Sequence, residues 1–216
     1  MAAIFIWLGF WQLDRAQQSQ ELSKPYVERP TISLAVVAQP DTNLSGDSVN
    51  RIVTFSGHYV ISWDAPNQID RNGRRSTWSV GLMVVDGGGS ILVARSTSSQ
   101  EIPKGDITVI GRLLPRQFED RGDGSNGTLR RIDPALVTQS YSGSIYDGFV
   151  VAITESQNGD AITAPRILMN PARPTIPGYY WQHIAYVVIW WLMALVVLFL
   201  PIYSRYTRNS RDSSRR

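Results

Sequence analysis

The chain has 216 residues, of which 43% are hydrophobic and 18% charged, and it contains no cysteine. Disulfide bonds, thiolate catalysis and thiolate-ligated zinc or copper are therefore excluded. The formal net charge of +3 comes from residues 205–216, where five arginines face one aspartate, so the rest of the chain carries −1. A domain without an excess of basic residues gives no support to nucleic-acid binding.

Residues 1–13 are almost entirely apolar and are followed by Asp14 and Arg15. They lack the basic start and the small-residue cleavage site of a signal peptide, and they are fewer than the roughly 20 residues that cross a bilayer. We interpret residues 1–15 as the second half of a first transmembrane helix whose start lies upstream. We expect the helix to continue through the polar residues 16–23 and to end before Pro25.

Residues 16–178 are predicted to form one extracytoplasmic domain that is mainly β. The strand pattern is clearest where the apolar residues Val53, Phe55, Tyr59 and Ile61 alternate with polar residues such as His58. Asn72-Gly73 and the glycine-rich residues 86–89 predict hairpin turns. The predicted strands are residues 51–61, 78–85, 90–95, 107–113, 148–154 and 162–169. Several short strands joined by turns predict a small antiparallel barrel or sandwich.

No set of residues in this domain predicts catalysis, so we expect the protein not to be an enzyme. A nucleophile needs a nearby base, and the two histidines of the chain are His58 and His183. His58 lies on the polar face of a predicted strand, where a solvated histidine is expected. There is no nucleophile elbow and no phosphate-binding loop. The arginines at positions 71, 74 and 75 have two interpretations, a solvated turn or a contact with anionic lipid headgroups or ligand carboxylates.

Residues 184–202 contain no charged side chain and would span roughly 28 Å as a helix, which matches the thickness of a bilayer core. Aromatic residues flank this run at both ends, as is typical of membrane interfaces. We predict a second transmembrane helix over residues 179–204 and a basic cytoplasmic tail over residues 205–216, because lysine and arginine favour the cytoplasmic side. Both termini would then be cytoplasmic. The lack of a mitochondrial presequence favours a multi-pass protein of the bacterial plasma membrane.

Both ends of the chain carry motifs. Residues 9–15, GFWQLDR, resemble the G-x-W-Q-x-x-R signature with which the first transmembrane helix of the surfeit locus protein 1 family leaves the membrane. Residues 183–190, HIAYVVIW, resemble the H-x-x-Y-A-x-x-W signature of the second helix, with valine in place of the alanine. Residues 91–95 and 107–113 resemble two strands of the same family. The resemblance extends over most of the chain, in the order anchor, β-domain, anchor.

The resemblance implies an assembly factor for haem-copper cytochrome c oxidase that acts when haem a enters the catalytic subunit. That subunit would be its partner in the respiratory chain, with haem a synthase, other respiratory subunits and membrane lipids as further partners. The family's histidine corresponds to His183, which makes His183 a candidate ligand of the iron of transiently bound haem a. A neutral imidazole is a good axial ligand, and Tyr186 and Trp190 follow it on one helical face that could receive a porphyrin.

Other interpretations remain open for these residues. His183 could be an interfacial histidine bonded to headgroups, with Trp190 packed on the first helix. Trp11, Gln12 and Arg15 are candidates for helix or partner packing, and Arg15 also for a contact with a haem propionate. At the level of the whole protein, the alternatives to a haem-handling chaperone are a structural interaction protein of the respiratory complex and a membrane-tethered ligand-binding or sensor domain.

Overall fold

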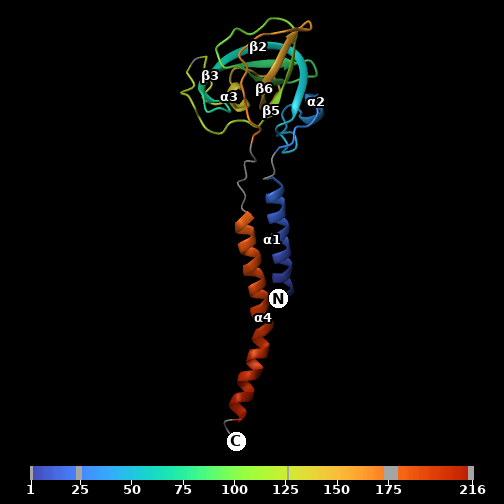
Figure 1. Cartoon of the computed structure of the whole chain (residues 1–216), viewed down its shortest axis with the longest axis vertical. Coiled ribbons are helices and arrows are strands. Elements are labelled where there is room, and N and C mark those ends of the chain that lie inside the picture. The colour runs from blue at the N-terminus through green and yellow to red at the C-terminus, as the bar shows by residue number, and fades with distance from the viewer. Residues whose placement is uncertain (1, 23–25, 126, 173–179, 214–216) are drawn as a thin grey trace. The chain divides into compact units, whose positions relative to one another are not determined.

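The computed structural model describes residues 2–22, 26–125, 127–172 and 180–213 (Figure 1). The chain divides into two compact units. One unit consists of Tyr26–Ala172, and the other combines Met1–Pro25 with Arg173–Arg216. Each unit has its own internal packing, and the two are described in turn.

The first unit is a closed β-barrel. Its sheet has the order β1-β2-β3-β4-β6-β5, and β5 pairs in addition with β2, so that five long strands form a ring. Figure 1 shows β2 curving along much of this ring. The elements are β1 (Ile32–Ser33), α2 (Leu34–Val37), β2 (Ile52–Ile69), β3 (Arg75–Val85), β4 (Ser90–Ser96), β5 (Ile107–Leu114), α3 (Pro134–Val137), β6 (Ile145–Gln157) and β7 (Asp160–Ala161).

The prediction of a barrel or sandwich is thus decided in favour of a barrel, but the prediction that it is antiparallel throughout is wrong. Strand β6 pairs antiparallel with β5 and parallel with β4. The parallel pair arises because β6 is inserted between β4 and β5, after a long excursion of the chain through residues 115–144. Crossovers of this length are what parallel neighbours require. The short β1 also pairs parallel with β2.

Strand β2 is longer than predicted and changes face part-way. The register passes from Tyr59 opposite Met83 to Ile61 opposite Leu82, which leaves Val60 as a bulge. A bulge adds one residue, so the side chains beyond it point to the opposite face. Tyr59 therefore packs in one core cluster and Ile61 packs against the other, and the prediction that both share a face is wrong.

Residues 162–169 were predicted as a strand, and this is also wrong. Only Asp160–Ala161 pairs with β6 as β7, and one further backbone bond joins the Ile162 N–H to the Glu155 carbonyl. Pro165 has no N–H and cannot continue a ladder. The segment instead makes single bonds, in which the Pro165 carbonyl accepts from Thr97 N–H and the Leu168 carbonyl accepts from Arg71 N–H.

The core of the barrel unit has two layers. Val93 of β4 belongs to a cluster with Val53, Phe55, Met83 and Val150, whereas its neighbour Leu92 packs with Trp78, Leu82, Phe149 and Ile132. Successive strand residues point to opposite faces, so both faces of β4 are covered. This explains why all seven residues of β4 are buried. The second layer is closed by α3 and the long excursion before β6, which contribute Leu129, Ile132 and Val137.

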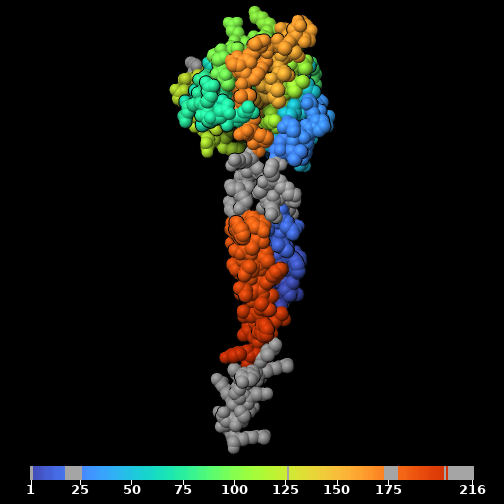
Figure 2. Space-filling view, viewed as in Figure 1, coloured from blue at the N-terminus to red at the C-terminus, as the bar shows by residue number. Residues whose placement is uncertain are grey.

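The second unit is a pair of helices, α1 (Ala2–Leu22) and α4 (Tyr180–Ser213), which pack along each other (Figures 1 and 2). Among the described residues, α4 alone is long and apolar enough to cross a membrane, over Tyr180–Pro201. Most of its large apolar side chains are exposed on the helix surface. α1 is helical where a helix was predicted, but its role as a transmembrane helix stays a prediction. Tyr179, the predicted first residue of the second span, lies outside the described residues.

Candidate functional site

One side of α4 faces α1, and it carries two of the three residues predicted to bind a cofactor. His183, Val187, Trp190 and Ala194 are spaced by four, three and four residues, which places them on one helical stripe. Val187 and Ala194 are buried, at 5% and 3% exposure. His183 and Trp190 both contact side chains of α1. The stripe is therefore a helix-packing surface with an imidazole at one end.

The imidazole of His183 is held by Gln12 of α1. Nδ1 of His183 lies 2.6 Å from Oε1 of Gln12, a short hydrogen bond. An amide oxygen only accepts, so Nδ1 is the donor and carries a proton. In the neutral imidazole the other nitrogen, Nε2, then keeps its lone pair. Among the described residues no hydrogen-bond partner of Nε2 is found. The histidine is thus oriented, with one nitrogen fixed and the other able to act as a ligand.

Aromatic rings fill the rest of the interface between the helices. Trp190 stacks on Phe5, with ring centroids 5.8 Å apart, and Trp191 meets Phe10 edge-on at 5.7 Å. Gly9 lies directly against the indole of Trp191, and a methyl group at Gly9 would overlap that ring. Small residues allow helices to approach closely in this way.

The indole N–H of Trp190 is buried and has no hydrogen-bond partner among the described residues. One face of the Trp190 ring is taken by Phe5. A flat ligand that approached His183 would therefore meet Trp190 at its remaining face or at its edge, where the indole nitrogen stands. A buried donor without an acceptor costs about 1–3 kcal/mol, so such a group is a place where an acceptor would be stabilised.

The remaining predicted residues lie less close to the interface. Tyr186 is 41% exposed, so it stands at the edge of the stripe rather than in it. Trp11 is 43% exposed, and the guanidinium of Arg15 lies over its ring at 5.8 Å. Of the three residues predicted for helix packing, Gln12 bonds His183 of α4, and the guanidinium of Arg15 lies over the Trp11 ring.

Sequence reasoning missed the residues that pack the two helices, Phe5, Gly9, Phe10 and Trp191. A signal for Gly9 was present, since it is the glycine of the GFWQLDR motif. Glycine commonly occurs where two packed helices approach each other closely. The aromatic partners could not be assigned, because the local sequence of each apolar helix does not show how the two helices are rotated against each other.

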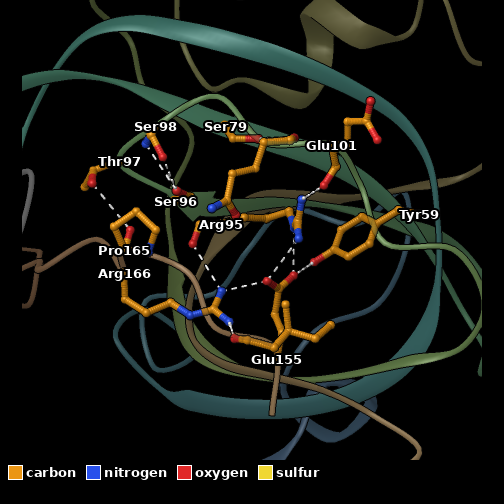
Figure 3. A network of polar contacts seen from close by, with 12 residues as sticks. Tyr59, Ser79, Arg95, Ser96, Thr97, Ser98, Glu101, Glu155, Pro165 and Arg166 are labelled. Atoms are coloured by element: carbon orange, nitrogen blue, oxygen red, sulfur yellow. Dashed lines mark hydrogen bonds and ion pairs between the residues drawn. The ribbon is translucent and has the colours of Figure 1, made fainter. Parts of the chain in front are cut away.

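A second polar cluster, also missed, lies inside the barrel unit (Figure 3). Glu155 of β6 accepts from Arg95 Nε at 2.8 Å, from Arg166 Nη1 at 2.6 Å and from the Tyr59 hydroxyl at 2.5 Å. The side chain of Arg95 is 1% exposed and that of Glu155 is fully buried. The guanidinium of Arg95 also lies 4.9 Å above the ring of Tyr59. Arg95 sits in the otherwise apolar strand of residues 91–95, and a charge in such a strand requires a buried partner.

The two arginines of this cluster hold the Glu155 carboxylate in its ionised form. Burial alone would raise the pKa of Glu155, but the hydrogen bonds from Arg95 and Arg166 outweigh it and keep the pKa below its ordinary value. Burial, reinforced by the neighbouring Glu155 carboxylate, raises the pKa of Tyr59 well above its ordinary value, so the phenol stays protonated and donates.

The remaining donors of the cluster are also used internally. Arg95 Nη1 bonds the Glu101 carbonyl at 3.2 Å, and Arg166 bonds the carbonyls of Arg95 and Ile162. A cluster in which each charged group is paired, and in which both arginines also bond backbone carbonyls, holds strands together. We therefore assign it a structural role, in which it ties residues 162–166 to the end of β4.

Among the described residues, no group of three or more histidine, aspartate or glutamate side chains is placed to hold a metal ion. His58, the other histidine, is exposed on β2 opposite Val84. The candidate site of the chain is thus the α1–α4 interface around His183.

Residues 1–195 match a sequence model described as the SURF1 family. The chain belongs to the SURF1 family. The match covers α1, the whole barrel unit and the part of α4 that carries His183 and Trp190, so it includes both helical motifs. A comparison of the chain with curated protein sequences found no match. The SURF1 family is membrane associated, and it is a family of assembly factors for cytochrome c oxidase.

Proposed function

We propose that this protein assists the insertion of haem a into the catalytic subunit of a haem-copper cytochrome c oxidase, and that His183 is its contact with the haem iron. The observation that carries the proposal is the bond between His183 and Gln12, which leaves Nε2 as a lone-pair donor. Membership of the SURF1 family supplies the oxidase as the destination. The catalytic subunit is the proposed partner, and haem a synthase is the proposed donor of the haem.

The proposed topology places both helices in the bacterial plasma membrane. α4 has the length and composition of a span over Tyr180–Pro201, and α1 packs along it through apolar and aromatic side chains. The arginines after residue 204 favour a cytoplasmic C-terminus. The barrel unit, which is joined to both helices, would then be extracytoplasmic, and His183 would lie near the outer end of α4.

The residues around His183 have the chemistry to hold haem a through its iron. Neutral imidazole is the ligand that haem iron takes most widely in proteins, and a hydrogen bond to the far nitrogen fixes the ring and raises its basicity. Gln12 makes that bond here. When bound, haem a would supply the redox-active iron that the oxidase needs. Gln12 would orient the ligand, Tyr186 would stand at the open edge of the site, and the indole N–H of Trp190 would meet an acceptor that it now lacks.

A second candidate function is a structural clamp that holds respiratory subunits and does not touch haem. It is favoured by the same stripe, because His183 and Trp190 already have partners within the helix pair. In that case the Gln12–His183 bond would be a hydrogen bond between two membrane helices, which stabilises their association by about 1 kcal/mol.

Titration of haem a into the purified full chain in detergent separates these two functions. We expect a shifted Soret band in the wild type and at least a tenfold weaker affinity in His183→Ala. His58→Ala is the matched control, because it removes the other histidine from an exposed strand position and should bind as the wild type does. If His183→Ala binds haem as tightly as His58→Ala, His183 is not the ligand and the clamp is the better account.

A further inference from the structure

The tip of the β2–β3 hairpin carries three exposed arginines within five residues, Arg71, Arg74 and Arg75. The turn beneath them is well fixed. The Asp70 N–H bonds the Arg74 carbonyl at 3.0 Å, and the Gly73 N–H bonds the Asp70 carbonyl at 3.1 Å. Gly73 has a φ of +77°, which glycine adopts without strain. The three guanidinium groups are therefore presented by a rigid turn.

The turn itself contains one carboxylate for the three guanidinium groups. Its one carboxylate, that of Asp70, accepts the backbone N–H groups of Asn72 at 2.8 Å and of Arg74 at 2.9 Å. No ion pair joins Arg71, Arg74 or Arg75 to a carboxylate in the part of the chain that the structure describes. Six other arginines of the barrel unit do form ion pairs, namely Arg95, Arg112, Arg116, Arg130, Arg131 and Arg166. The hairpin tip differs from the other unpaired cations among the described residues of the barrel unit, Arg29, Arg51, Lys104 and Arg121, because it gathers three within five residues.

The neighbourhood of Arg75 is partly acidic. Arg75 borders a surface hollow that is also lined by Glu119, Asp120 and Arg121. Asp120 is already paired with Arg131 at 2.7 Å, so it compensates Arg75 only in part. Glu119 forms no ion pair in the described residues and lies in the same hollow, so the proposal depends chiefly on Arg71 and Arg74, at the turn itself.

Exposed apolar side chains stand beside this charge. Ile69, at the end of β2, is 40% exposed, and Leu168 is 43% exposed. The Arg71 N–H bonds the Leu168 carbonyl at 2.7 Å, which joins the hairpin to the segment that carries Leu168. Arginine beside exposed aliphatic groups is the composition of surfaces that rest on a lipid interface.

We propose that this hairpin tip, formed by Ile69, Arg71, Arg74, Arg75 and Leu168, binds the phosphate groups of anionic lipids. A guanidinium group forms paired hydrogen bonds with phosphate oxygens, and Ile69 and Leu168 have the size to enter the interfacial layer. A lipid surface is the occupant that the chain itself points to. The same chain contains α4, which has the composition of a membrane span, so that lipid phosphate is always within tethered reach of the barrel unit.

The proposal rests on the membrane anchor of the proposed function and on nothing about haem or the oxidase. The absence of cysteine makes it directly testable, because Asn72→Cys places a single fluorophore at the tip. The full labelled chain would be reconstituted into bilayers of phosphatidylcholine alone or of equal parts phosphatidylcholine and phosphatidylglycerol. Quenching by a headgroup-linked spin label then measures how often the tip lies on the surface.

We expect strong quenching in the anionic bilayer, weak quenching in the neutral one, and a fall with rising salt. Each arginine replaced by glutamine should weaken the contact about fivefold. Lys104→Gln is the control, since it removes one positive charge from the exposed loop before β5, whose first residue, Ile107, pairs with Gly57 and not with the hairpin end of β2, and it should leave quenching unchanged. A label at Gly87→Cys, on the exposed β3–β4 turn, reports whether the whole unit is simply near the membrane.

Equal quenching of the Asn72→Cys label in both bilayers would overturn the proposal. So would quenching that persists in Arg71→Gln/Arg74→Gln. Both results leave haem binding by His183 untouched, because that is measured in detergent with no lipid surface. Loss of haem binding in His183→Ala, in turn, has no bearing on the quenching.

Discussion

Replacement of Glu155 by glutamine tests the assigned role of the buried cluster most sharply. The amide has nearly the size of the carboxylate but no charge, so packing is retained while the ion pairs are lost. Arg95, 1% exposed, would then keep a positive charge in the barrel with no carboxylate beside it. Arg166 and the Tyr59 hydroxyl lose their charged acceptor at the same time.

The expected loss follows from the burial of the pair. Removal of one partner from a buried ion pair costs about 3–5 kcal/mol, because the other charge is left uncompensated. In a unit of this size 1 kcal/mol lowers the melting temperature by roughly 3–4 °C, so we expect a fall of roughly 10–20 °C. The matched control is Glu28→Gln. Glu28 is 55% exposed and pairs with Arg112 at 3.0 Å, and such a surface pair contributes at most about 1 kcal/mol.

Thermal unfolding of the full chain, followed by near-ultraviolet circular dichroism at several pH values, would measure both effects. The pKa of Glu155 is lowered in the folded protein, so its contribution to the free energy of unfolding is fully present above about pH 4.5 and is lost as the pH falls through the folded pKa. Glu155→Gln should therefore lose stability at neutral pH and show a flatter decline in acid. Equal melting temperatures for Glu155→Gln and Glu28→Gln at pH 7 would refute the structural role.

Three further predictions concern helix packing and caps. Gly9→Val should separate α1 from α4, because its side chain would overlap the indole of Trp191, and cross-linking between cysteines placed on the two helices should fall; unchanged cross-linking would contradict the packing. Gln12→Leu should weaken haem a binding several-fold, but less than His183→Ala, because the ligand remains and only its orienting bond is lost; wild-type affinity would remove Gln12 from the site. Asp133→Ala should lower the free energy of unfolding by more than the roughly 1 kcal/mol of a helix cap, because the same buried carboxylate caps α3 and pairs with Arg131 Nε at 2.9 Å. Asp133→Asn should restore the capping part alone, and full restoration by asparagine would contradict a role for the ion pair.

The elements that the sequence predicted well are those whose signal is local. Alternation along β2 as far as Tyr59, the Asn72-Gly73 turn and the uncharged run of residues 184–202 depend on neighbours in the chain, and each appears where it was expected. The failures are non-local. The bulge at Val60 and the insertion of β6 beside β4 are set by pairing partners far away in the sequence.

The candidate site divides in the same way. His183, Trp190 and Gln12 could be selected from their motifs, but the bond between His183 and Gln12 joins residues 171 positions apart and required the packed helices. The same is true of Glu155, which looks like an ordinary strand residue until Arg95 and Arg166 are placed around it. The partners of such buried charges are determined by the fold, so the local sequence pattern does not predict them.

The most direct test of the central claim is a reduced-minus-oxidised difference spectrum of native membranes from the wild type, a deletion strain and a His183→Ala strain. We expect the haem a band to be weaker than in the wild type in both the deletion strain and the His183→Ala strain, and unchanged in a His58→Ala strain. A band that falls on deletion but not in His183→Ala would contradict the assigned site. A band and an oxygen consumption that are both unchanged by deletion would contradict the oxidase assembly function itself.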